Sequence, residues 1–260
     1  GLQSLKANTT ADGNLAMGHA ALRANTTGAN NTAVGGLEAG TYGVLQTNTT
    51  GSFNTGLGNG ALAFSTTASQ NTALGYQSLF NNTTASCNVA VGLCSLHANT
   101  TGTRNTAIGY KTLDNGNANN DSVAIGFASL SNTSNTSANN TGVGSYSLLS
   151  NTGDNNTAVG FCSMASNTTA SCNTAVGYLA LKTSSTGSQN VAVGADALAL
   201  NTTGANNVAI GFKALVSNTT ANENVAVGRC SLKSNTTGTQ NAAIGNYSLD
   251  SNTTAVLSLA

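Results

Sequence analysis

The chain has 260 residues, of which only 6% are charged, and its eight Lys/Arg balance its eight Asp/Glu. About a quarter of the residues of an ordinary globular domain are charged. This neutral composition, without a basic stripe, argues against a nucleic-acid partner. No apolar run approaches the roughly 18 residues of a membrane span, so we expect no membrane insertion.

One repeat fills the chain from residue 1 to residue 260. Its most regular element is a glycine that ends an Ala-Val-Gly or Ala-Ile-Gly tripeptide or a close variant, called here the marker glycine. The markers are Gly1, Gly18, Gly35, Gly58, Gly75, Gly92, Gly109, Gly126, Gly144, Gly160, Gly177, Gly194, Gly211, Gly228 and Gly245. Most recur at every seventeenth position, as from Gly75 to Gly92, and six extra residues lie between Gly35 and Gly58. The consensus is N-T-A-V-G-x-x-[AS]-L-x-x-N-T-T-[GA]-x-x.

The length of this repeat predicts an all-β fold. Helical repeats need about 30 or more residues, whereas a unit as short as this one holds two short strands and two turns. We therefore expect a parallel β-solenoid (a β-roll) of about fifteen coils. The Val/Ile column before the marker and the Leu column four residues after it are the expected core. The Ala two residues before the marker would face another chain or the second strand of its own coil, and the first alternative predicts a homotrimeric rod.

The A-[VI]-G-x-x-[AS]-L unit resembles the head repeats of trimeric autotransporter adhesins. Its fuller form, present at Asn71 to Thr84 and Asn173 to Leu181, also resembles repeat regions of phage and large-virus tail-fibre proteins. The resemblance covers nearly all of the chain and implies trimeric β-rolls. The neck, stalk and anchor of the adhesins do not match any part of it.

These patterns predict a non-catalytic structural or adhesive fibre. We find no spacing typical of a catalytic, metal or cofactor site, so we expect neither an enzyme nor a cofactor. The expected partners are further copies of the chain and a host-cell receptor or glycan. The expected location is extracellular, on a virion or a cell surface, and we expect the chain to be a segment of a longer fibre. The alternative is an ice-binding solenoid that uses columns of threonine, such as Thr26/Thr27 and Thr49/Thr50.

Recognition requires irregularity, and three irregular loops are expected at residues 36–45, 114–121 and 132–140. The first supplies the predicted receptor-contact loop, Gly40, Thr41, Tyr42 and Gly43, in which Tyr42 is the strongest candidate because an exposed aromatic ring suits sugar or protein contact. The alternative is that all three loops are neutral insertions. The run from Asp114 to Asp121 also places oxygen ligands at alternate positions, as calcium loops do, but without their bidentate Glu.

The sequence allows two covalent modifications, N-glycosylation and disulfide formation. Asn-Thr-Thr sequons in turns would accept N-glycans in a host that glycosylates secreted proteins, unless the motif is only turn chemistry. They begin at Asn8, Asn25, Asn48, Asn82, Asn99, Asn167, Asn201, Asn218, Asn235 and Asn252. Among the cysteines, the pairs Cys87–Cys94 and Cys162–Cys172 are close enough in the repeat to form disulfides, and free thiols are the alternative.

Overall fold

The structure is a computed structural model that describes residues 1–36, 42–116, 118–132 and 137–260. The chain divides into two compact units, Gly1–Thr136 and Ser137–Ala260. Each is a stack of coils with one three-residue strand per coil, and no helix occurs among the described residues.

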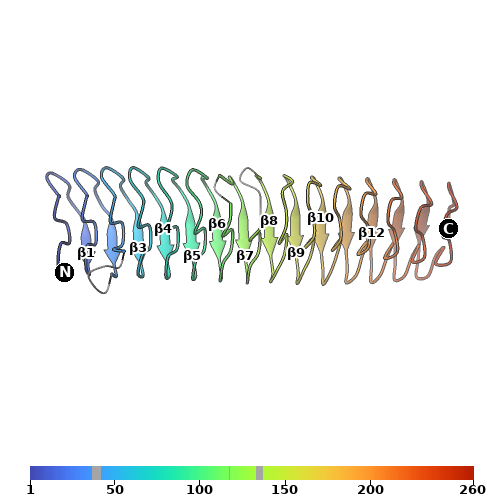
Figure 1. Cartoon of the computed structure of the whole chain (residues 1–260). Coiled ribbons are helices and arrows are strands. Elements are labelled where there is room, and N and C mark those ends of the chain that lie inside the picture. The colour runs from blue at the N-terminus through green and yellow to red at the C-terminus, as the bar shows by residue number, and fades with distance from the viewer. Residues whose placement is uncertain (37–41, 117, 133–136) are drawn as a thin grey trace. The chain divides into compact units, whose positions relative to one another are not determined.

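The first unit contains seven strands that follow one another in chain order (Figure 1). Each pairs in parallel with the next, and the marker columns stay in register across the ladder. The strands are β1 (Leu15–Met17), β2 (Thr32–Val34), β3 (Thr55–Leu57), β4 (Thr72–Leu74), β5 (Val89–Val91), β6 (Thr106–Ile108) and β7 (Val123–Ile125).

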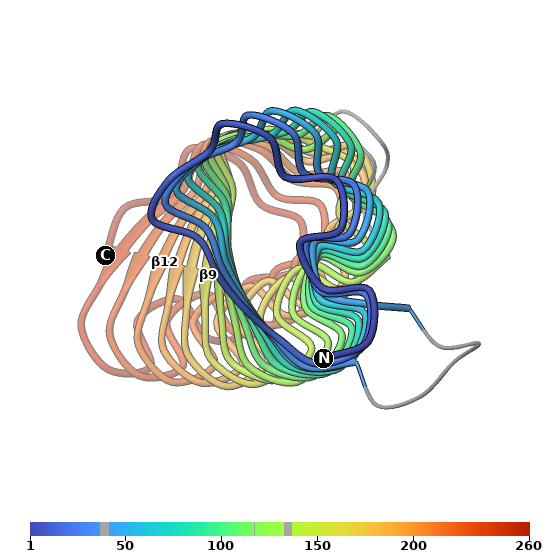
Figure 2. The same cartoon turned by 90° about the vertical axis from the view of Figure 1, so that its left-hand side faces the viewer.

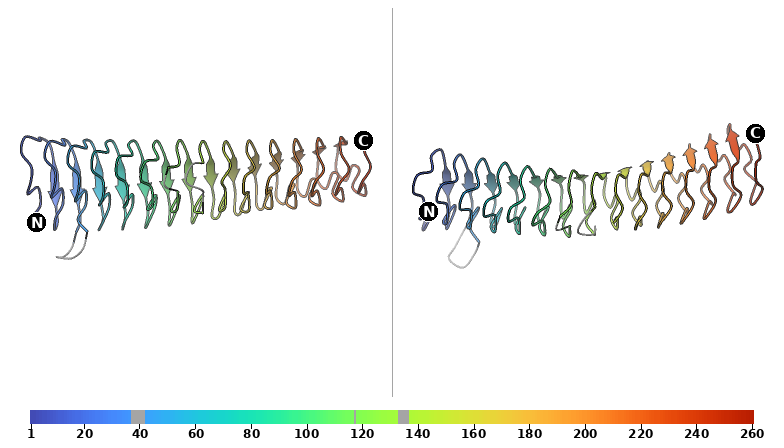
Figure 3. Two further views of the ribbon diagram at one scale, coloured as in Figure 1. Left: turned by 45° about the horizontal axis from the view of Figure 1, so that its top comes forward. Right: turned by 90° about the horizontal axis from the view of Figure 1, so that it is seen from above.

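The second unit repeats this arrangement, and Figure 3 follows its strands from two further directions. Its parallel ladder aligns Ala158, Ala175, Ala192, Ala209 and Ala226. Its strands are β8 (Thr141–Val143), β9 (Thr157–Val159), β10 (Thr174–Val176), β11 (Val191–Val193), β12 (Val208–Ile210), β13 (Val225–Val227) and β14 (Ala242–Ile244). The predicted all-β parallel solenoid is confirmed.

The second strand expected in each coil is not formed in the part of the chain that the structure describes. That part of the coil is a series of turns in which the Leu column adopts left-handed backbone, for example φ 50° at Leu79 and 51° at Leu96. Left-handed backbone costs roughly 1–2 kcal/mol in a residue with a side chain. Complete burial of a leucine contributes roughly 1.5–3 kcal/mol, and these leucines are fully buried. Burial therefore offsets the strain, a balance that backbone propensities do not reveal.

The predicted core is half wrong. The Leu column is buried, but the Val/Ile column before the marker points outward, with Leu74 41% and Ile210 40% exposed. The alanine between the two outward residues of each strand faces inward instead, and Ala73 and Ala192 are 0% exposed. Alanine thus packs inside its own coil and does not face another chain, but the second strand against which the other alternative placed it is not formed in the described residues.

The marker glycine is required for two reasons. Its φ lies in the positive range, for example 136° at Gly75 and 130° at Gly92, where L side chains are strained. In addition, a methyl group on Gly75 would lie 2.5 Å from the carbonyl oxygen of Gly92 in the next coil. The close approach of successive coils at this corner therefore excludes any side chain.

Two columns of buried asparagines complete the interior. One lies four residues before the marker: the Asn71 Oδ1 accepts from the Asn88 backbone N–H at 2.9 Å, and the Asn71 Nδ2 donates to the Ala85 carbonyl at 2.9 Å. The other is the first residue of Asn-Thr-Thr: the Asn82 Nδ2 donates to the same Ala85 carbonyl at 2.9 Å. The Asn99 Nδ2 in turn donates to the Asn82 Oδ1 at 3.0 Å. Buried amides are stable only when they are hydrogen-bonded, and the repeat places a partner beside most of these groups, although the Asn48 and Asn167 Oδ1 atoms are buried without one.

Candidate functional site

The first candidate surface is the outward strand face, defined as the side chains one and three residues before each marker. Seen along the first unit, the strands occupy one side of the coils and turns close the other (Figure 2). Val, Ile, Leu or Met fills the first of these columns, and Thr or Val fills most of the second. Exposed members include Leu57 at 44% and Val176 at 37%. Neither column carries a charged side chain.

Aromatic residues extend this face beyond the marker. They follow it directly, are 41% to 54% exposed, and comprise Tyr76, Tyr110, Phe127, Phe161, Tyr178 and Phe212. Rings in successive coils stack, with centroids 5.0 Å apart for Tyr110–Phe127 and 5.7 Å for Phe161–Tyr178. The distance between neighbouring rings therefore follows the coil spacing of about 4.8 Å.

The second candidate is an aromatic cluster in the first unit, formed by Tyr42, Phe64, Phe80 and His97. The Tyr42 ring lies 5.3 Å from Phe64 and 4.9 Å from Phe80, and Phe64 and Phe80 meet edge to face at 5.0 Å. His97 stacks on Phe80 at 5.2 Å. Such pairs contribute about 0.5–1.5 kcal/mol each beyond burial of their area. The cluster thus fixes Tyr42 against the coils while leaving it 45% exposed.

A groove of about 510 Å³ lies beside this cluster. Its lining consists of Thr47, Phe64, Thr66, Asn81, Thr83, Ala98 and Thr100. Phe64, Asn81 and Ala98 occupy one position in three successive coils, so the groove runs across the coils. Its threonines lie about half a coil from the strands, because Thr83 is ten residues after Ala73 and seven before Ala90.

The threonine hydroxyls are used within the ladder. The Thr66 Oγ1 donates to the Thr83 carbonyl and the Thr83 Oγ1 to the Thr100 carbonyl, both at 3.1 Å. The Thr47 Oγ1 donates to the Ala63 and Ser65 carbonyls at 2.9 and 3.0 Å. These hydroxyls are turned toward the backbone, and those of Thr66 and Thr83 belong to the first threonine column, on which an ice-binding surface would depend.

The predicted receptor-contact loop is only partly described. Gly40 and Thr41 lie outside the described residues, whereas Tyr42 belongs to the aromatic cluster. The Gly43 N–H donates to the Gln46 Oε1 at 2.8 Å. The predicted end of the loop at residue 45 is wrong, because Val44 and Leu45 are fully buried core residues in register with the other coils. The other three members of the cluster were not predicted, although Phe64, Phe80 and His97 follow one another at intervals of 16 and 17 residues, about one repeat length.

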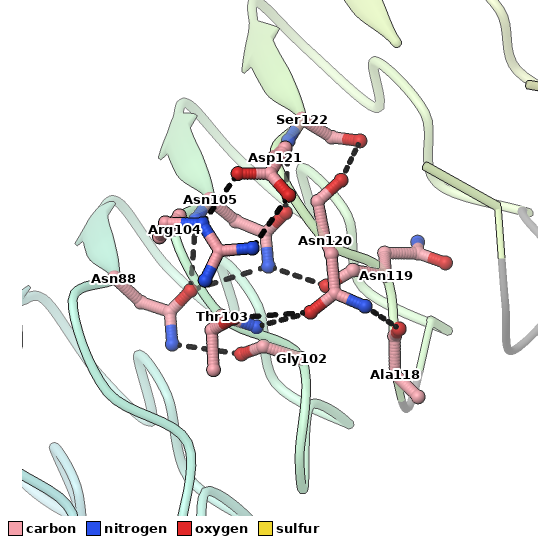
Figure 4. A network of polar contacts seen from close by, with 10 residues as sticks. All are labelled: Asn88, Gly102, Thr103, Arg104, Asn105, Ala118, Asn119, Asn120, Asp121 and Ser122. Atoms are coloured by element: carbon pink, nitrogen blue, oxygen red, sulfur yellow. Dashed lines mark hydrogen bonds and ion pairs between the residues drawn. The ribbon is translucent and has the colours of Figure 1, made fainter. Parts of the chain in front are cut away.

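The loop at residues 114–121 forms polar contacts between coils (Figure 4). The Arg104 guanidinium contacts both carboxylate oxygens of Asp121, at 2.5 and 2.7 Å, and this pairing holds the pKa of Asp121 below its usual range. The Asn120 Oδ1 accepts from the Thr103 N–H at 2.8 Å. These groups bind one another, and no cluster of three or more His, Cys, Asp or Glu that could hold a metal ion is found among the described residues. In the loop expected at 132–140, residues 133–136 lie outside the described part.

The exposure that glycosylation requires is absent at eight of the ten sequons. Their asparagines are the buried inner column, and they are Asn25, Asn48, Asn82, Asn99, Asn167, Asn201, Asn218 and Asn235. Most of these amides donate to the carbonyl three residues on, as in Asn25 to Gly28 at 2.9 Å. The folded coil therefore does not present these eight asparagines as glycan acceptors, although the second threonine of the turn is exposed in coils such as those of Thr27 and Thr203. Asn8 is exposed and Asn252 is partly exposed.

All five cysteines are free, so neither predicted disulfide is present. Cys87 and Cys172 lie five residues before a marker, and Cys94 and Cys162 lie two residues after one. These positions flank a strand at opposite ends, about 10 Å or more apart at 3.3 Å per residue, whereas a disulfide needs Cα atoms within about 7 Å. Burial raises the pKa of the Cys94 and Cys162 thiols.

No described segment forms a helix long and apolar enough to span a membrane. Comparison of the chain with protein-family models, with curated proteins and with solved structures finds no match.

Proposed function

We propose that this chain is the shaft of an extracellular, non-catalytic fibre, of the kind found in virus tail fibres or cell-surface adhesins, and that it assembles as a homotrimer. The observation that carries the proposal is the outward strand face. One of its two columns is apolar in every coil, the other is mostly Thr or Val, and the adjoining aromatic column enlarges the face. Soluble monomers seldom expose contiguous apolar patches of more than a few hundred Å².

The regular spacing of the face selects the partner. A surface repeated at every strand spacing of about 4.8 Å can be contacted equally in each coil only by an object with the same period. A second copy of this chain has that period. Strands with apolar residues on both faces are usually covered on both, which further supports burial of the outward face between copies.

The molecular mass in solution tests this proposal. Native 1–260 chain should have about three times the mass of the 25.6 kDa polypeptide by light scattering. Replacing Val193 and Ile210 with lysine should produce a monomer that retains its β-sheet circular dichroism. Replacing the exposed turn residues Thr203 and Thr220 with lysine is the matched control and should leave the mass unchanged. A native chain that is monomeric at all concentrations would refute self-association.

The ice-binding alternative is tested separately by thermal hysteresis of the same sample. The hydroxyls of the first threonine column donate to backbone carbonyls of the next coil, as in Thr202 to Thr219 at 3.0 Å, which gives this alternative no support. A fibre shaft should show no hysteresis. A clear hysteresis gap that the Thr203→Lys and Thr220→Lys changes abolish would favour ice binding instead.

A further inference from the structure

We propose that the groove beside the aromatic cluster binds a neutral oligosaccharide. This goes beyond the fibre proposal, because the groove is formed entirely by residues of one chain within the first unit. Its walls are the Phe64 ring and the threonines that follow it across the coils.

The charge of the lining determines the charge of the ligand. No Lys, Arg, His, Asp or Glu lines the groove. An anion or a cation would lose part of its hydration there without gaining an opposite charge, which is unfavourable. The groove therefore suits an uncharged molecule and disfavours phosphorylated, sulfated or uronic ligands.

The polarity of the walls selects a molecule with an apolar face. The hydroxyls of Thr47, Thr66 and Thr83 are turned toward backbone carbonyls, which leaves their methyl groups for the groove. Phe64 adds a ring that Tyr42 and Phe80 hold in place. A pyranose presents a face of C–H groups that packs against such a surface.

The remaining polar group and the open side of the groove favour a sugar over an acyl chain. The Asn81 side chain lies at the groove and is partly exposed, so its amide can bond to a hydroxyl group. The groove is open to solvent on one side, so a bound sugar keeps its outer hydroxyls hydrated. An acyl chain in the same place would leave its outer apolar surface in water, which is unfavourable.

Isothermal titration calorimetry of the 1–260 chain tests the proposal with three neutral probes: maltohexaose, cellohexaose and the hexamer of N-acetylglucosamine. We expect at least one to bind with a Kd of about 1 mM or tighter. Phe64→Ala should weaken that binding about tenfold, since it removes the ring wall. Ala98→Trp should abolish it by filling the groove without removing a core residue.

Phe53→Ala is the matched control, because it removes a 60% exposed ring that belongs neither to the groove nor to the outward strand face, and it should leave the Kd unchanged. Circular dichroism of each variant verifies the fold. The proposal is overturned if none of the three hexamers binds, if Phe64→Ala and Ala98→Trp both bind like the native chain, or if galacturonic acid hexamer or 1-octanol binds in their place. A monomeric chain that still binds a neutral hexamer would refute the fibre proposal and leave this one intact.

Discussion

At the scale of single residues, the asparagine columns show how strongly the repeat depends on one side-chain length. Serine replaces asparagine at Ser65 in the inner column, and its shorter side chain does not reach the Asn48 Oδ1. Ser184 likewise leaves the Asn167 Oδ1 unpaired, although its hydroxyl still donates to the Gly187 carbonyl at 3.1 Å. The Asn48 Oδ1 and the Ser65 Oγ are consequently buried without a hydrogen-bond partner. A buried unpaired polar atom costs about 1–3 kcal/mol, so this coil is a weak point of the ladder.

Ser65→Asn should therefore stabilise the first unit by about 1–3 kcal/mol. The new amide would bond to Asn48, to Asn82 and to the Ala68 carbonyl, as its equivalents do in neighbouring coils. The midpoint of urea unfolding measures the change. Ser65→Ala is the control, since it removes the unpaired hydroxyl but leaves Asn48 unsatisfied and should gain less. A midpoint below that of the native chain would show that the serine fits the coil better than asparagine does.

Asp114 is the residue whose charge is least compatible with its surroundings. Burial raises its pKa above the ordinary value of 3.8, although His97 and Lys111 lower it in part. The folded chain therefore binds a proton at Asp114 more readily than the unfolded chain does. The contribution of Asp114 to stability is therefore greatest below pH 3.8 and falls as the pH rises toward the raised pKa of the folded state.

Asp114→Asn should accordingly stabilise the chain at pH 7 and have a smaller effect at pH 3, as measured by urea unfolding at both values. Asp12→Asn, which removes the same charge from an exposed site, serves as control. An Asp114→Asn variant that is less stable than the native chain at pH 7 would mean that the contact with His97 outweighs the cost of burial.

At the scale of the coil, the marker glycine combines two constraints that substitution can separate. Gly211 has φ 130°, and a methyl group on it would lie 2.6 Å from the Gly228 carbonyl oxygen, whereas Gly245 has φ 128° and open space around the same position. Gly245→Ala should cost only the strain of positive φ, about 1–2 kcal/mol. Gly211→Ala should cost roughly twice as much or more. Equal losses in unfolding free energy would show that coil contact does not contribute.

Two residues in the core of one coil, Val44 and Gly56, have side chains of complementary size. In other coils the position of Val44 holds Ala, Ser or Thr, as in the pairs Ala61 with Ala73 and Ser78 with Ala90. A methyl group on Gly56 would clash with the Val44 side chain. The large side chain of Val44 therefore fits because Gly56 has no side chain.

Each single change, Gly56→Ala or Val44→Ala, should destabilise the chain by about 1–3 kcal/mol, the first through overpacking and the second through a cavity. The double variant restores the Ala/Ala pair and should lose clearly less than the sum of the two. A double-mutant cycle on unfolding free energies measures this coupling, and strictly additive losses would contradict the size match.

The repeat length and the strand position of each coil were predictable from the sequence, but the faces of the strand were not. In Val191–Val193 both faces are apolar, so alternation alone does not tell inside from outside. Hydrophobicity favours Val for the interior, yet the narrow coil admits only a methyl group beside the Leu column. Similarly, nothing in Leu79 or Leu96 signals left-handed backbone, which only complete burial in the coil makes stable.

At the scale of the whole molecule, the candidate sites differ in how well the sequence could predict them. Tyr42 was recognisable because it lies next to the insertion. The groove was not, because it depends on the direction in which the threonine hydroxyls point. The outward strand face was misassigned to the core, and its exposure is the feature on which the fibre proposal depends.

Crosslinking between copies tests that proposal most directly. In a background with the five cysteines replaced by serine, a single cysteine would be placed at Ile210 on the outward strand face, or at Thr203 in the turn as control. Packed sheets lie about 10 Å apart, so a bis-maleimide of about that span should join copies. Self-association predicts covalent dimers and trimers for Ile210→Cys and almost none for Thr203→Cys. Equal crosslinking at both sites, or none at either, would contradict burial of the outward strand face between copies.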